Sequence, residues 1–316
     1  MMITYSAPGK IILSGEHSVV YTKPALVTAV DLLLTATIQT GTPSKFDPKV
    51  KEAFAYCDGI VKAYLEKQSV HIHDQEFSFS VRSEIPEGRG MGSSAAFCVA
   101  TVAALLHFYT GKPYDKETIN SLAYKCEHHF HGMPSGVDVS ASCFGGLIYY
   151  RKEFEFLKYI SALNFKIPKN IQDKLVLIDS GKPVESTSDM VKLVGKKYNT
   201  ETSAMEQTLV GIEKVTKRMV VSIVKEDLTF FSECIGENQK LLVDFGIVST
   251  STQALLDELT PYGVGKVTGA GGQQEGSGLI LFVIRDTEGF ETYCREKKLR
   301  TIPFQQNFEG VLEVRE

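Results

Sequence analysis

The sequence predicts an α+β fold in two halves, and three observations support this. The chain has 316 residues, beyond the size at which one hydrophobic core usually stops growing. Both halves contain short apolar or alternating stretches and longer helical patterns. Between them, residues 164–174 (NFKIPKNIQDK) form a lysine-containing stretch interrupted by proline. We therefore predict one domain over residues 1–170 and a second over residues 171–316.

The first half is predicted to begin with strands and continue with helices. KIILSG and ALVTAVDLLLTATIQT are rich in β-branched residues, and FSFSVRSEI (77–85) alternates apolar and polar residues. From Ser93, the run SSAAFCVATVAALLHFYT is apolar nearly all round, which is typical of a buried helix. A second helix is predicted from about Asp115 to Gly132, and a third after Pro134.

The second half begins with a short buried strand, LVLIDS (175–180). Two long helical patterns follow, at residues 187–220 and 225–242. Then KVTGAGG and GLILFVI indicate a glycine loop beside another strand.

Composition excludes several classes of protein. A net charge of -4 and a pI near 6.0 disfavour nucleic-acid or membrane-surface binding. Six scattered cysteines without a C-x-x-C pair argue against a disulfide framework. No signal-peptide pattern opens the chain, and no apolar run approaches the roughly 20 residues of a membrane span. We expect a reduced, cytoplasmic protein with no nucleic-acid or membrane partner.

The stretch PEGRGMGSSAA, residues 86–96, places three glycines at every second position ahead of a predicted helix. The first N–H groups of a helix lack intrahelical partners and favour negative charge, and glycines let the backbone approach phosphates closely. The spacing fits neither the P-loop nor the dinucleotide-binding fingerprint. On spacing alone, an anion site and an ordinary surface turn both fit.

Two further segments contain candidate chemistry. In APGKIILSGEHSVVY (7–21), Lys10 stands at a strand edge and Glu16-His17 follow a glycine, although a strand-edge lysine is often only solvated. In CEHHFHGMPSGVDVSAS (126–142), Glu127 and Asp138 lie on neighbouring elements. They suit a Mg²⁺ ligand and an acid/base group, or else are surface or capping residues. The histidines nearby do not match the spacing of a zinc protease.

In this order, these segments and KVTGAGG (266–272) resemble the GHMP small-molecule kinases. GEHSVVY and the eleven-residue separation of Glu127 and Asp138 are most similar to the mevalonate kinases within that family. The resemblance implies a two-domain fold, with a ribosomal S5 domain 2-like N-terminal domain and a ferredoxin-like C-terminal domain. It also implies ATP- and Mg²⁺-dependent phosphorylation of the primary hydroxyl of mevalonate, and homodimers are common in the family.

The resemblance further implies a role for each motif residue. Asp138 and Lys10 would be catalytic, and Ser94 and Glu127 would bind Mg²⁺. The ATP phosphates would lie on Pro86, Gly88, Arg89, Gly90, Met91, Gly92, Ser93, Ser94 and Ala95. The substrate would contact Glu16, His17, Asp138, Thr187, Gly269 and Ala270.

Two positions depart from the family pattern. Met91 stands where the family usually has leucine, a swap of similar volume. Gln273-Gln274-Glu275 interrupts the small residues of the last glycine loop, which places a carboxylate near an expected phosphate site. Three interpretations therefore remain open, namely a mevalonate kinase, a kinase of phosphomevalonate or another small alcohol, and a non-catalytic sensor with this fold.

Overall fold

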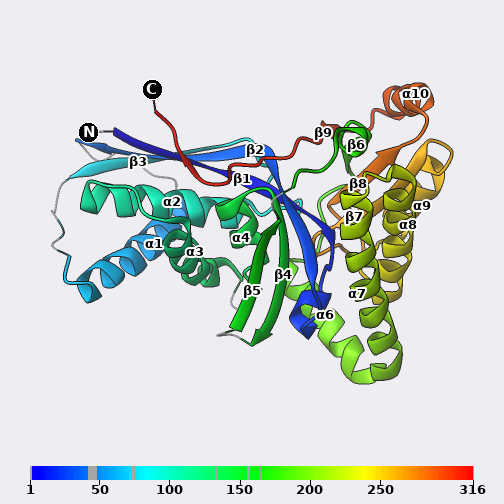
Figure 1. The fold of residues 1–316 in the computed structure, drawn as a ribbon, viewed down its shortest axis with the longest axis horizontal. Helices are drawn as coiled ribbons and strands as arrows, with labels where there is room; N and C mark the ends of the chain where they lie inside the picture. Colours follow the sequence, from blue (N-terminus) through cyan, green and yellow to red (C-terminus); the bar gives the residue numbers. More distant parts are fainter. Residues whose placement is uncertain are drawn as a thin grey trace.

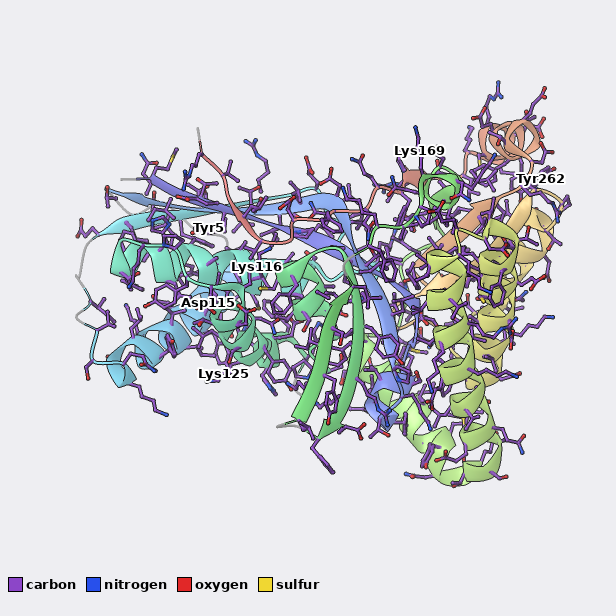
Figure 2. The ribbon with its side chains drawn as sticks, viewed as in Figure 1. Tyr5, Asp115, Lys116, Lys125, Lys169 and Tyr262 are labelled. Atoms are coloured by element: carbon purple, nitrogen blue, oxygen red, sulfur yellow. The ribbon has the colours of Figure 1, made fainter. Side chains whose placement is uncertain are left out.

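The computed structural model describes residues 2–41, 48–70, 72, 76–131, 134–154, 157–163 and 165–315. It confirms the α+β prediction, because the helices are combined with two separate sheets. The first sheet and its helices form one part of the molecule, and the second sheet with a stack of helices forms the other (Figure 1). Tyr5 lies in the first part, Lys169 lies at the junction, and Tyr262 lies at the far end of the second part (Figure 2).

The first sheet has six strands, and two of them are long. Its order is β10-β1-β2-β4-β5, with β3 paired to the outer part of β2, and all pairs are antiparallel. The strands are β1 (Met2–Ser14), β2 (Ala25–Thr40), β3 (Phe77–Ser83), β4 (Leu147–Phe154), β5 (Leu157–Leu163) and β10 (Leu312–Glu313). A short 3-10 helix, η1 (Ser18–Tyr21), connects β1 to β2.

Helices α1 to α4 cover one face of this sheet (Figure 1). They are α1 (Pro48–Lys67), α2 (Ser93–Thr110), α3 (Lys116–His131) and α4 (Val137–Phe144). Helix α2 is long and apolar enough to cross a membrane, and 78% of it is buried inside the protein, as expected for the central helix of a folded core. The predicted end of the second helix at Gly132 lies outside the described residues.

The second part is built on a four-stranded antiparallel sheet in the order β7-β8-β6-β9. Its strands are β6 (Leu175–Asp179), β7 (Gly263–Thr268), β8 (Leu279–Ile284) and β9 (Thr301–Pro303). The helices are α5 (Lys169–Gln172), α6 (Thr187–Thr200), α7 (Thr202–Val224), α8 (Leu228–Phe245), α9 (Thr250–Leu259) and α10 (Thr287–Lys297).

The end of β1 joins the two parts. The Ile12 N–H donates to Thr268 Oγ1 at 3.0 Å, and Thr268 Oγ1 donates back to the Ile12 carbonyl at 3.1 Å. The C-terminal segment returns from the second part to the first, because its strand β10 pairs with β1 in the first sheet. The boundary at residue 170 therefore stays a prediction, and the last strand lies with the first part.

Several elements differ from the sequence predictions. The helical pattern at 187–220 is two helices rather than one, because Glu201 leaves the helical conformation at φ -129° and separates α6 from α7. The pattern at 225–242 starts later, at α8, where the Asp227 side chain accepts the Phe230 N–H as an N-cap. Helices α1, α9 and α10 and the β4-β5 hairpin were not predicted. All six cysteines are free thiols.

Candidate active site

The site is centred on an ion pair between the first strand and the start of α4. Lys10 Nζ lies 3.1 Å from Asp138 Oδ1. The lysine side chain is 3% exposed, whereas the Asp138 side chain is 30% exposed. Asp138 is the second residue of α4, two positions after the left-handed N-cap Gly136. Its carboxylate is therefore held by a buried cation and remains open to a ligand.

The three glycines of residues 88–92 each make room for a different neighbour. All three have positive φ, between 66° and 79°, a conformation that glycine adopts without steric cost. A Cβ on Gly92 would lie 3.0 Å from Lys10 Cγ, and a Cβ on Gly90 would lie 3.3 Å from the Thr268 carbonyl oxygen. A Cβ on Gly88 would lie 2.8 Å from Lys182 Cε. The glycine spacing therefore lets two lysines and the second glycine loop approach this backbone.

The loop leads directly into α2. Gly92 is the N-cap, and no side chain caps this end of the helix. No acidic residue stands in the first turn, so the first N–H groups remain available to an anion. The side chains of Met91 and Ala95 are buried, so these two residues can contact a ligand only through their backbone.

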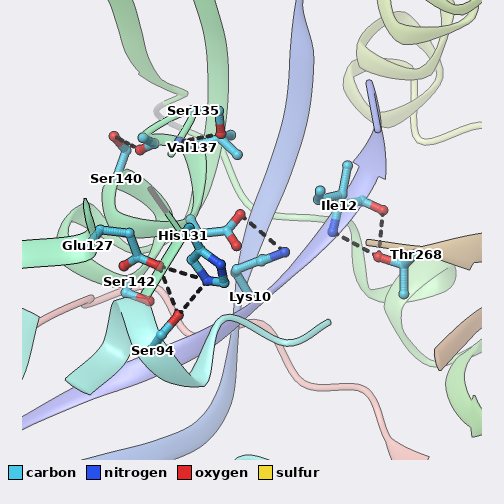
Figure 3. Close-up of polar contacts among 12 residues, drawn as sticks. Lys10, Ile12, Ser94, Glu127, His131, Ser135, Val137, Ser140, Ser142 and Thr268 are labelled. Carbon is cyan, nitrogen blue, oxygen red and sulfur yellow. Dashed lines mark hydrogen bonds and ion pairs between the residues drawn. The ribbon is translucent and has the colours of Figure 1, made fainter. Parts of the chain in front are cut away.

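A cluster of three polar side chains lies at the start of α2 and the end of α3 (Figure 3). Ser94 Oγ donates to Glu127 Oε1 at 2.8 Å and lies 3.0 Å from His131 Nε2. His131 Nε2 is 3.2 Å from Glu127 Oε1, and this carboxylate raises the pKa of His131. Glu127 is 2% exposed, and its Oε2 has no hydrogen-bond partner among the described residues. A buried carboxylate oxygen of this kind is suited to a cation.

Glu16 and His17 occupy different environments. Glu16 pairs with Lys266 of β7, and both side chains are completely buried. Burial raises the pKa of Glu16 and lowers the pKa of Lys266, and each charge opposes the shift of the other. The His17 Nε2–H donates to the Ala270 carbonyl at 2.9 Å, and burial lowers the pKa of His17.

A cavity of about 420 Å³ lies where the two glycine loops meet. It is lined by Gly88, Arg89, Gly90, Lys182, Pro183, Val184, Glu185, Ser186, Thr187, Thr268, Ala270, Gly271, Ser277 and Gly278. Thr187 is the first residue of α6, where a capping box of Ser186 and Asp189 fixes the helix end. Gly269 lies beside the cavity, because its Cβ would be 3.3 Å from Gly90 Cα.

Comparison with known proteins identifies the family of this chain. A family model described as the GHMP kinases N terminal domain matches residues 54–146. Mevalonate kinase from Archaeoglobus fulgidus is 31% identical over 276 residues, which cover 84% of this chain and 88% of that protein. Mevalonate kinase from Pyrococcus horikoshii is 30% identical over 301 residues, covering 84% and 85%.

The chain belongs to the mevalonate kinase family of GHMP kinases. The crystal structure of the Methanococcus jannaschii mevalonate kinase superposes with a TM-score of 0.77 at 22% identity, covering 97% of this chain and 98% of that one. This likeness confirms the two-domain α+β GHMP kinase fold that the motifs implied.

The inserted residues of this family member do not place a carboxylate in the cavity. Gln273, Gln274 and Glu275 are all exposed. The carboxylate that lines the cavity is instead Glu185, which accepts the N–H groups of Gln273 and Gln274 at 3.3 and 3.2 Å.

Sequence reasoning missed several residues of this region. Lys266 stands inside the last glycine motif, yet nothing in the sequence assigned it a partner 250 residues away. His131 belongs to the group of histidines whose spacing does not match a zinc protease, and no sequence pattern indicated its contact with Ser94. The ion pair of Arg89 with Asp179 at 2.8 Å, which holds the glycine loop against β6, also had no sequence signal.

Proposed function

We propose that this protein transfers the γ-phosphoryl group of ATP to the primary hydroxyl of mevalonate, forming 5-phosphomevalonate. The observation that carries the proposal is the Lys10–Asp138 ion pair beside the glycine loop. The pair occurs in a chain that is 31% identical to a protein named mevalonate kinase. ATP is the co-substrate of this kinase family.

Asp138 is the proposed catalytic base. Its carboxylate accepts the proton of the substrate hydroxyl while that oxygen bonds to the γ-phosphorus and the bond to the ADP oxygen breaks. Lys10 holds Asp138 in position and stabilises the negative charge on the transferring group. The proton leaves to solvent from Asp138 after transfer. Positioning and electrostatics therefore supply most of the rate acceleration.

The glycine loop is the proposed ATP phosphate site. Its backbone N–H groups and the start of α2 offer donors to phosphate oxygens. The proposed contacts are Pro86, Gly88, Arg89, Gly90, Met91, Gly92, Ser93, Ser94 and Ala95.

Ser94 and Glu127 are the proposed protein ligands of Mg²⁺. The unpartnered Oε2 of Glu127 and the adjacent serine hydroxyl fit a hard cation. Among the described residues, no group of three His, Cys, Asp or Glu side chains could hold a metal ion alone. This suits an ion that takes its other ligands from ATP and water. When bound, Mg²⁺ neutralises charge on the β- and γ-phosphates.

The substrate side is proposed to include His17, Thr187, Gly269 and Ala270. Thr187 and Ala270 line the cavity, and His17 is hydrogen-bonded to the Ala270 carbonyl. Glu16 has a different proposed role, because its buried carboxylate is held by Lys266. We assign it to supporting the His17 segment rather than contacting the substrate.

The substrate is tested by ADP release from purified protein with ATP and Mg²⁺, offering mevalonate, phosphomevalonate, galactose and homoserine in parallel. Turnover with mevalonate alone is expected. Turnover with another alcohol would support kinase activity but show that the acceptor substrate is not mevalonate. Nucleotide binding without turnover on any of the four would favour the non-catalytic sensor.

Three further predictions concern the protein as a whole. We propose a homodimer, which light scattering on a size-exclusion column distinguishes from a monomer.

A cytoplasmic location and the domain boundary at residue 170 also stay predictions. Limited proteolysis with mass spectrometry locates accessible inter-domain segments and tests the boundary.

A further inference from the structure

Lys182 is a cation of the cavity to which neither the motifs nor the proposed mechanism assigns a role. It follows β6 and lies across the glycine loop, where the absence of a side chain at Gly88 makes room for it. Its Nζ is 3.5 Å from the position that a Cβ on Gly88 would occupy. At the other end of the same loop, Lys10 packs against Gly92 in the same manner. The loop therefore lies between two lysines. Lys10 is paired with Asp138, whereas no carboxylate among the described residues forms an ion pair with Lys182.

Lys182 is exposed, and the other two charged side chains of the cavity wall, Arg89 and Glu185, have partners of their own. Arg89, another cation of the cavity wall, is paired with Asp179 at 2.8 Å. Glu185, the carboxylate of the same wall, accepts the backbone N–H groups of Gln273 and Gln274. Within the described residues, no ion pair joins Lys182 to a carboxylate.

The inserted loop is itself anchored, which fixes the two N–H groups that hold Glu185. Gln273 Nε2 donates to the Gly246 carbonyl at 2.7 Å, at the end of α8. The Gly272 N–H donates to the Ile247 carbonyl at 2.9 Å. Glu185 is therefore held by a loop whose own position is set by the second part of the molecule.

We propose that Lys182 binds the carboxylate of the acceptor substrate, and that the 273–275 insertion keeps Glu185 from neutralising it. This inference rests on the proposed function. Mevalonate has a carboxylate at one end of a five-carbon chain and the reacting hydroxyl at the other. The cavity that contains Lys182 also contains Thr187 and Ala270, the proposed substrate side, whereas Lys10 and Asp138 lie at the opposite end of the glycine loop. A charge-assisted ammonium–carboxylate contact then fixes which end of the substrate faces Asp138.

The test compares Lys182→Ala and Lys182→Arg with Lys196→Ala, a matched exposed lysine on α6. For Lys182→Ala, the KM for mevalonate is expected to rise about tenfold, with kcat and the KM for ATP within about twofold of wild type. Lys182→Arg keeps the charge and restores most of the affinity. Lys196→Ala changes neither constant.

A neutral substrate analogue separates charge recognition from a structural effect. The wild type is expected to prefer mevalonate over its primary amide, 3,5-dihydroxy-3-methylpentanamide, and Lys182→Ala is expected to lose most of that preference. A variant that merely disturbs the loop would lower turnover of both compounds and keep their ratio.

The role of the insertion is tested by deleting residues 273–275, alone and combined with Glu185→Gln. Deletion frees Glu185 to pair with Lys182 and is expected to raise the KM for mevalonate. Adding Glu185→Gln to the deletion is expected to lower the KM for mevalonate again. If the deletion and the substitution acted independently, their effects on this KM would simply add. If the deleted chain does not fold, the Lys182 variants and the amide still decide the assignment of Lys182.

The outcomes separate two kinds of failure. Turnover of mevalonate by the wild type with an unchanged KM in Lys182→Ala would overturn this inference and leave the proposed function intact. A rise in the KM for ATP alone would place Lys182 on the nucleotide and also overturn it. No wild-type turnover of mevalonate would overturn the proposed function, and this inference with it.

Discussion

Two lysine–carboxylate pairs flank the end of β1, and they differ in how far each reaches solvent. In the Lys10–Asp138 pair, the carboxylate is 30% exposed and stands at the first turn of α4. In the Lys266–Glu16 pair, both side chains are 0% exposed. Lys266 also donates to the Ile12 carbonyl at 3.2 Å, which ties β7 to β1. A ligand can therefore reach the Lys10–Asp138 pair, whereas the Lys266–Glu16 pair is closed to ligands.

Burial decides what each pair can do. Removing two charges from water is costly, and their attraction compensates for this only in good geometry. The partly exposed carboxylate of Asp138 contacts Lys10 through Oδ1, so Oδ2 can accept a substrate proton. The buried pair of Glu16 and Lys266 has no such access and instead fixes the two parts of the molecule against each other. The first pair is expected to determine turnover, and the second to determine stability.

Asp138→Asn is the variant with the largest expected effect. The amide keeps the shape of the carboxylate but cannot accept the substrate proton, so kcat is expected to fall by about 10³-fold or more. ATP binding and folding are expected to be retained. Steady-state kinetics and calorimetric titration with ATP measure both, with the exposed Asp173→Asn as control. Near-normal turnover by Asp138→Asn would show that Asp138 is not the catalytic base.

Lys266→Met tests the buried pair. It leaves Glu16 in the interior without its partner, and the free energy of unfolding is expected to fall by about 3–5 kcal/mol. Urea denaturation measures the loss, with the exposed Lys196→Met as control. The double variant with Glu16→Gln is expected to recover part of the stability, because the unpaired charge is gone. A loss below about 1 kcal/mol would mean that the pair does not join the two parts.

Glu127→Gln tests a third carboxylate, which is buried like Glu16 but has Ser94 and His131 as neighbours instead of a lysine. The Mg²⁺ concentration for half-maximal activity is expected to rise about tenfold or more, because the variant lacks a charged ligand. Binding of Mg·ATP, followed by calorimetry, is expected to weaken in parallel. Glu117→Gln, on the exposed first turn of the same helix, is the control. An unchanged Mg²⁺ titration would exclude Glu127 from the metal site.

His17 is expected to give the smallest effect, one on the pH dependence of stability. Burial lowers its pKa below 6.5, so the folded state binds the proton less well than the unfolded state. The contribution of His17 is fully present above the unfolded pKa and is lost as the pH falls below it, by at most about 1.4 kcal/mol per pH unit. Urea denaturation between about pH 7 and pH 5 is expected to show a steeper loss for the wild type than for His17→Gln. Parallel curves would contradict the assignment.

The sequence predicted the parts of the site that lie within short motifs. Ser94 and Glu127 meet because each lies in a recognisable segment on a helix whose position the family fold determines, and the same holds for Lys10 and Asp138. Their residue types, rather than any calculated geometry, indicated a phosphoryl-transfer site. The strand ahead of the glycine loop and the buried helix after it were predicted for the same reason, since both have strong local patterns.

Contacts between distant segments could not be predicted in this way. Lys266 and Glu16 are separated by 250 residues, and nothing local to either residue indicates the other. The hydrogen bonds from the inserted loop to Glu185 form because β6 and α8 bring residues 185 and 273 together. The break between α6 and α7 was missed because both helices continue the same polar and apolar pattern across Glu201.

The most direct test of the central claim is the fate of the phosphoryl group. Mevalonate has a primary hydroxyl at carbon 5 and a tertiary hydroxyl at carbon 3, so phosphorus NMR of the wild-type reaction mixture identifies the acceptor. The account predicts equimolar ADP and a phosphate ester whose signal is split into a triplet by the two protons of carbon 5. A phosphate ester without that splitting, or ADP formed with only inorganic phosphate, would contradict it.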